Sequence, residues 1–154
     1  MSAEHDPISS FTGEHAFLSN FYPAVVRYGG WTYPSVEHAY QAAKCGTNRV
    51  YQARFRVAPP FPSRTPTAAQ AKRMGRAIAL PHDWDEKKVD LMRSLLRSKF
   101  NPTTNARLRG QLVATRGRHL VEGDIGFKLR HRVQVEGRAG EFHAAFPAAP
   151  GQRF

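Results

Sequence analysis

The chain has 154 residues, a length that suits one domain around a continuous hydrophobic core. Its composition, 41% hydrophobic and 23% charged, is typical of a soluble globular protein, and no apolar run approaches the ~20 residues that cross a bilayer. We therefore expect no membrane segment. The single cysteine, Cys45, cannot form an internal disulfide, and residues 1–10 lack the pattern of a signal peptide, so a cytoplasmic setting is predicted.

The net charge of +11 favours an anionic partner. Nine lysines and arginines but only one acid, Asp90, lie between Lys87 and Arg118. Such a segment is either a solvated helix surface or a positive field for phosphates, whether of a nucleotide or of a nucleic acid backbone. Charge alone does not separate these alternatives.

The first predicted elements are a hairpin and a helix. Two short strands, 25–28 and 31–33, flank Gly29 and Gly30, which tolerate the positive φ of a tight turn. Ser35 is a plausible N-cap for the helix that follows. Val36, Ala39, Tyr40 and Ala43 recur at helical spacing on its apolar side.

The rest of the chain is predicted to be mainly helical. Thr67 to Gln70 fits a capping box, and Asp83 to Glu86 offers a second start of the same kind. The predicted order is an irregular segment over 48–66 with at most a short helical piece, helices over about 67–80, 83–100 and 104–115, and a strand over 119–122. The expected fold is therefore α+β, a single compact, mainly helical domain over residues 1–154 with a small antiparallel hairpin or sheet.

The candidate chemistry lies on the helix that begins after Ser35. Glu37, Gln41 and Lys44 form a strip along its shoulder, beside the apolar face and not opposite to it. An acid, an amide and an amine in that place can act on a polar substrate, although Glu37 is also suited to stabilise the helix N-terminus. No H-E-x-x-H, G-x-G-x-x-G, P-loop or G-x-S-x-G pattern occurs, so no metal and no cofactor is expected.

Several blocks of sequence, in order, resemble one family. Phe17-Leu18-Ser19-Asn20-Phe21-Tyr22-Pro23 and the run from Trp31 to Lys44 are similar to the signature of the YbiA-like N-glycosidases, the NADAR family. Later blocks match as well: Gly75-Arg76, Asp83-Trp84 with Lys87 and Met92, Lys99-Phe100, and Leu120-Val121-Glu122-Gly123. The resemblance covers residues 17–123.

The resemblance implies hydrolysis of the N-glycosidic bond of a ribosylated base. The substrate would be either ADP-ribose on guanine, in a nucleotide or nucleic acid, or a phosphoribosylamino-pyrimidine of riboflavin synthesis. Such cleavage needs stabilisation of positive charge at the ribose C1 and an acid or base for the leaving group or water. Glu37 is the candidate for that work, and Lys44 is the candidate to hold the open-chain sugar as a Schiff base.

Further residues are candidates for binding the substrate. Ser19, Asn20 and Gln41 can hydrogen-bond ribose hydroxyls or phosphate, but Ser19 and Asn20 equally suit a turn or cap. Trp84 can stack on a base or anchor a helix in the core. Guanidinium groups suited to phosphate pairing are those of Arg54, Arg56 and Arg76.

The resemblance ends at Gly123. Residues 124–154 form a divergent tail without tryptophan, where the family continues with a Trp-Gly segment and a closing helix. The alternative function is therefore a catalytically impaired module that binds ADP-ribose or nucleic acid. The sequence does not indicate an oligomeric state.

Overall fold

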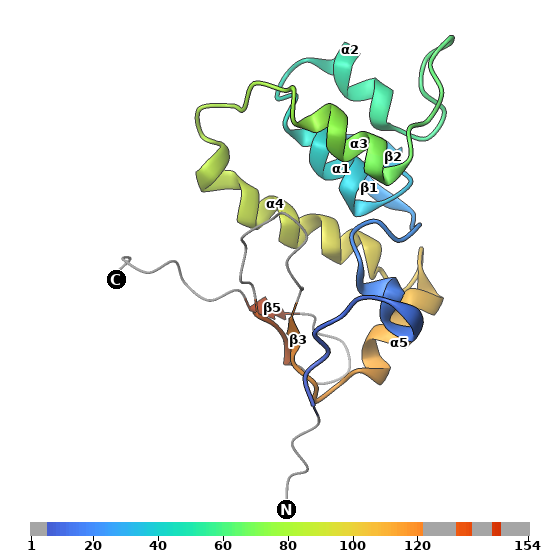
Figure 1. Ribbon diagram of the computed structural model, residues 1–154, viewed down its shortest axis with the longest axis vertical. Coiled ribbons are helices and arrows are strands. Elements are labelled where there is room, and N and C mark those ends of the chain that lie inside the picture. Colours follow the sequence, from blue (N-terminus) through green and yellow to red (C-terminus); the bar gives the residue numbers. More distant parts are fainter. Residues whose placement is uncertain (1–5, 122–131, 137–142, 146–154) are drawn as a thin grey trace, which may run out of the picture. The chain divides into compact units, whose positions relative to one another are not determined.

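The computed structural model describes residues 6–121, 132–136 and 143–145. The chain falls into two compact units, one of residues 1–19 with 111–154 and one of residues 20–110. The second unit holds the predicted strip of Glu37, Gln41 and Lys44 (Figure 1).

The hairpin of the second unit confirms its prediction. β1 (Val26–Tyr28) pairs antiparallel with β2 (Trp31–Tyr33), and Tyr28 lies opposite Trp31 next to the turn. Gly29 and Gly30 have φ of +56° and +83°, the left-handed backbone that favours glycine. The hairpin leads directly into the helix that carries the strip.

Helix α1 (Val36–Ala43) starts as predicted and is buried on every side. The Ser35 hydroxyl accepts a hydrogen bond from the His38 backbone N–H, which is the expected N-cap contact. The His38 ring is also fixed: its Nε2 lies 2.7 Å from the Pro66 carbonyl, which can only accept, so Nδ1 accepts from the Ser35 hydroxyl at 2.6 Å. His38 therefore joins the start of α1 to the segment before the next long helix.

The predicted irregular segment contains only two short helical pieces, α2 (Arg49–Gln52) and η2 (Ala53–Phe55). The capping box at Thr67 and Gln70 is present and starts α3 (Ala68–Gly75). This helix ends at Gly75 and not near Leu80. Its last residues pass into a turn in which Arg76, Ala77 and Ile78 bond three residues back, so the helix tightens and stops before Pro81 is reached.

Helix α4 (Trp84–Lys99) was predicted with nearly these bounds, but the second capping box was wrong. The Asp83 side chain caps no backbone N–H and pairs instead with Lys87 one turn later. The C-terminal end of α4 is joined to the hairpin, because Ser98 Oγ accepts from the Arg27 backbone N–H at 2.8 Å. Asn105 Nδ2 adds a second link to the Val25 carbonyl at 2.8 Å.

These contacts surround the core of the second unit. Its most deeply buried side chains come from the hairpin, α1, η2 and α4, and include Val26, Tyr33, Val36, Phe55 and Leu95. Helix α5 (Ala106–Ala114) begins in this unit and ends in the other, slightly inside the predicted bounds.

The first unit contains η1 (Gly13–Leu18) and an antiparallel sheet in the order β3-β4-β5. β3 (Leu120–Val121) confirms the predicted strand as far as Val121, since Glu122 lies outside the described residues. β4 (Arg132–Glu136) and β5 (His143–Ala145) were not predicted, and the rest of the 124–154 tail lies outside the described residues.

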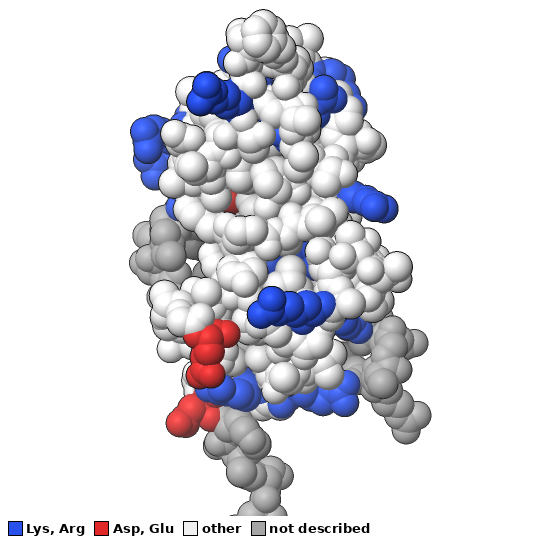
Figure 2. Space-filling view, turned by 90° about the vertical axis from the view of Figure 1, so that its right-hand side faces the viewer, with Lys and Arg blue, Asp and Glu red and all other residues white. Residues whose placement is uncertain are grey.

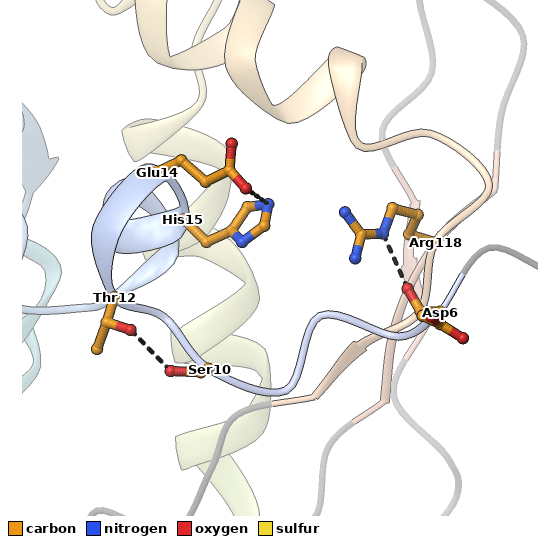
Figure 3. Close-up of polar contacts among 6 residues, drawn as sticks. All are labelled: Asp6, Ser10, Thr12, Glu14, His15 and Arg118. Atoms are coloured by element: carbon orange, nitrogen blue, oxygen red, sulfur yellow. Dashed lines mark hydrogen bonds and ion pairs between the residues drawn. The ribbon is translucent and has the colours of Figure 1, made fainter.

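The N-terminal segment of this unit, residues 6–12, is held mainly by hydrogen bonds of its backbone. Ile8 bridges to Leu120, and its N–H donates to the His119 carbonyl at 2.8 Å. Figure 3 shows Arg118 Nε donating to the Asp6 carbonyl at 2.8 Å. The hydroxyls of Ser10 and Thr12 lie 2.8 Å apart in the same segment.

Candidate functional site

Glu37 is the acid at the centre of the candidate site. Its side chain is only 8% exposed, and its Oε1 accepts a hydrogen bond of 2.6 Å from Gln41 Nε2, one helical turn later. Its backbone N–H donates to the Asn20 carbonyl at 3.0 Å, which links the first turn of α1 to the first family block. The carboxylate is therefore held in one orientation inside the protein.

Burial changes the proton affinity of this acid. Desolvation raises the pKa of Glu37, while the Gln41 hydrogen bond and the positive charges of Lys72 and Lys44 oppose that rise. Burial also lowers the pKa of Lys44, the Glu37 charge opposes that fall, and Lys72 adds to it. Both shifts favour the neutral forms of the Glu37 acid and the Lys44 amine.

Lys44 sits at the end of α1, where it is the C-cap residue and half-buried. Its Nζ lies 5.4 Å from the centroid of the Tyr40 ring. Tyr40 packs edge-on against Trp84, with ring centroids 5.2 Å apart. The buried Trp84 ring thus supports the ring that lies next to the Lys44 amine.

Gly75 explains how closely α3 approaches α1 (Figure 1). A Cβ built on Gly75 would lie 1.7 Å from Gln41 Oε1 and 2.4 Å from Gln41 Cδ. Any side chain here would push Gln41 out of its place beside Glu37. Close packing of α3 on α1 therefore explains why the Gly75-Arg76 block has a glycine at its first position.

The structure brings together part of the predicted site. Glu37, Gln41 and Lys44 lie along α1 as expected, with the Asn20 carbonyl on the Glu37 N–H. The Asn20 side chain is turned to Met92, with Nδ2 4.0 Å from Sδ. Ser19 belongs to the first unit, where its N–H donates to the Ala16 carbonyl.

The predicted phosphate-binding arginines are not gathered around Glu37 by any described contact. Arg54 and Arg76 are exposed, and Arg76 follows directly after α3. Arg54 lies over the Tyr51 ring, with Cζ 4.9 Å from the centroid. Arg56 lies over the Trp31 ring at 4.6 Å.

Sequence reasoning missed Lys72 and the role of Tyr40. Lys72 projects from α3, and its charge acts on both Glu37 and Lys44. The capping box at Thr67 had located that helix, but no local pattern shows that α3 packs on α1. Tyr40 was assigned to the apolar face, and its spacing of four from Lys44 was the available signal.

Positive side chains predominate over negative ones on the face drawn in Figure 2. Within the described residues, no cluster of three or more histidine, cysteine, aspartate or glutamate side chains is placed to hold a metal ion. None of the helices described is both long and apolar enough to cross a membrane.

Together the fold and the site define an α+β protein with a buried acid held by an amide and coupled to two amines. The chain belongs to the NADAR domain family, whose model matches residues 5–125. This confirms the predicted family, and the match extends slightly beyond the expected 17–123.

Curated relatives support the same assignment. The chain is 37% identical over 132 residues to riboflavin biosynthesis protein VVA0006 of Vibrio vulnificus, covering 84% of this chain and 31% of that protein. It is 33% identical over 115 residues to N-glycosidase YbiA of Escherichia coli, covering 73% of this chain and 66% of YbiA. The chain thus spans about a third of the length of the Vibrio protein and just under two thirds of the length of YbiA.

The solved structure of Escherichia coli YbiA, determined by NMR, has a similar fold. The TM-score is 0.62 at 30% sequence identity, and the alignment covers 79% of this chain and 68% of YbiA. The predicted α+β class, mainly helical with a small antiparallel sheet, is confirmed.

Proposed function

We propose that the protein is an N-glycosidase that hydrolyses the bond between a ribose and a base. Family membership and the name of the relative YbiA support this activity. The observation that carries the proposal is the buried Glu37, oriented by Gln41 and coupled to the Lys44 and Lys72 amines. The substrate is a ribosylated base, and no cofactor is required for this hydrolysis.

In this proposal Glu37 faces the ribose C1. As the base departs, positive charge develops at C1 and the ring oxygen, and a carboxylate stabilises it or removes a proton from the attacking water. A low-dielectric setting strengthens that attraction. The Gln41 bond keeps the oxygen in place during the step.

Lys44 is the proposed covalent partner. Burial lowers the pKa of its amine, which increases the neutral, nucleophilic fraction. Condensation of that amine with the open-chain sugar aldehyde forms an imine and releases water, and hydrolysis of the imine returns the free sugar and lysine. Trp84 acts as a positioning residue through Tyr40, whose ring lies beside the Lys44 amine.

The remaining assignments belong to the same proposal. Ser19, Asn20, Arg54 and Arg76 contribute to substrate binding, and the two units form one domain, because the family match includes residues of both. The substrate is either ADP-ribosylated guanine or a phosphoribosylamino-pyrimidine, the second supported by the name of the Vibrio relative. The free Cys45 supports a cytoplasmic location.

The test is release of sugar from ADP-ribosylated guanine DNA and from the phosphoribosylamino-pyrimidine, with borohydride added to trap an imine. We expect release from one of the two and a reduced covalent adduct on Lys44 by mass spectrometry. Lys44→Ala should lose the adduct, whereas Lys88→Ala, which removes a half-buried lysine amine paired with Asp85, should keep it. Ligand binding without release by the folded protein would instead favour the non-catalytic module.

A further inference from the structure

Three arginines of the second unit lie on aromatic rings. Arg49 Cζ is 3.7 Å and Arg56 Cζ is 4.6 Å from the centroid of Trp31, and Arg54 Cζ is 4.9 Å from that of Tyr51. We call these five residues the Trp31 face. Stacking holds each guanidinium plane in a defined place.

Within the described residues, no aspartate or glutamate forms an ion pair with the Trp31 face. Residues 38–82 contain eight lysines and arginines and no aspartate or glutamate. Among the described residues, none of the ion pairs involves Arg49, Arg54 or Arg56, and Arg49 Nη1 donates only to the neutral Gln52 Oε1, at 2.8 Å. These charges are positioned yet not compensated within the described part of the protein.

Apolar side chains are exposed in the same stretch of chain. Phe61 is 97% exposed and Val50 is 80% exposed, while Trp31, on β2, is half-buried. The glycine turn approaches the face as well, since a Cβ on Gly29 would lie 3.3 Å from Arg49 Nη1. The stretch of chain from Trp31 to Phe61 thus carries stacked cations together with exposed apolar side chains.

We propose that the Trp31 face binds single-stranded nucleic acid. The N–H edges of Arg49 and Arg54 pair with backbone phosphates, because both side chains are exposed and lack an acidic partner. The outer guanidinium planes and the Phe61 ring offer stacking surfaces for bases, which an intact duplex does not present. Arg54 is shared with the proposed substrate-binding residues, but Glu37 and Lys44 are not part of this face, so binding here is measured apart from turnover.

Binding is measured by the tryptophan fluorescence of the full chain, using an oligothymidine of about 12 nucleotides as the probe. Trp84 is buried, so quenching on binding reports chiefly on Trp31. Each phosphate contact contributes a salt slope of roughly 0.7, so the two phosphate-pairing arginines predict about a 7-fold loss of affinity between about 50 and 200 mM salt. Arg49→Gln/Arg54→Gln should reduce the slope by about 1.4 and weaken binding at the lower salt concentration.

The matched control is Arg97→Gln/Arg107→Gln, which removes the same charge from exposed positions on α4 and α5. It should leave the quenching and nearly all the affinity unchanged. Equal losses in the two double variants would overturn the proposal, since binding would then follow net charge. Equal affinity for duplex DNA or dextran sulfate, or the absence of binding at the lower salt concentration, would overturn it as well.

Discussion

Gly75→Ala perturbs the contact between α3 and Gln41. The added Cβ would lie 1.7 Å from Gln41 Oε1, and Gln41 is 3% exposed, so its amide has to turn away from Glu37. The bond that breaks involves a charged group and is worth about 1.5–3 kcal/mol. Alanine is more favourable than glycine in a helix by about 1 kcal/mol, so we expect a net loss of about 0.5–2 kcal/mol in the free energy of unfolding.

Chemical denaturation measures this loss, and a double-mutant cycle identifies its cause. In a Gln41→Ala background the blocking amide is gone, so Gly75→Ala should stabilise the protein by up to about 1 kcal/mol. Gly110→Ala on α5, where a Cβ meets nothing within 4 Å, is the control and should also stabilise. A stabilised Gly75→Ala single variant would refute the reasoning.

Three further predictions concern buried side chains. Burial raises the pKa of Glu37 in the folded protein, so the free energy of unfolding falls as pH rises from the unfolded pKa of about 4.5 through the folded pKa. Glu37→Gln should therefore gain stability relative to wild type as pH rises, and thermal melts that show a constant difference would contradict this. Burial lowers the pKa of His38, so below pH 6.5 the unfolded chain binds more protons than the folded protein and stability falls on acidification. His38→Gln should reduce that fall in stability, and an unchanged pH profile of unfolding would count against this prediction. Trp84→Ala should cost about 3–5 kcal/mol by denaturation, whereas Trp84→Phe should retain most of the stability, and equal losses would contradict the packing on Tyr40.

Local chemistry explains which elements the sequence predicted. The glycine turn, the Ser35 N-cap and the Thr67 capping box each depend on residues within a few positions, and all three are present. Asp83 fitted the same capping pattern but pairs with Lys87, and its backbone, with φ −97° and ψ 13°, departs from the extended conformation of a capping residue.

Long-range packing explains what the sequence did not predict. The strip of Glu37, Gln41 and Lys44 follows from helix geometry, but the burial of α1 on every side depends on α3 and η2, which lie far along the chain. The influence of Lys72 on both titrating groups has the same origin. Gly75 was visible as part of a family block, yet its contact with Gln41 appears only when the two helices are packed.

The most direct test of the account is the kcat/KM of Glu37→Gln for whichever ribosylated base the protein cleaves. Gln preserves the shape and the hydrogen bond to Gln41 but removes the charge and the proton acceptor, so we predict a loss of roughly 10²–10⁴-fold with the fold intact. Glu86→Gln, on the exposed first turn of α4, is the matched control and should retain wild-type turnover. If Glu37→Gln turned over as fast as Glu86→Gln, the central role of the buried acid would be contradicted.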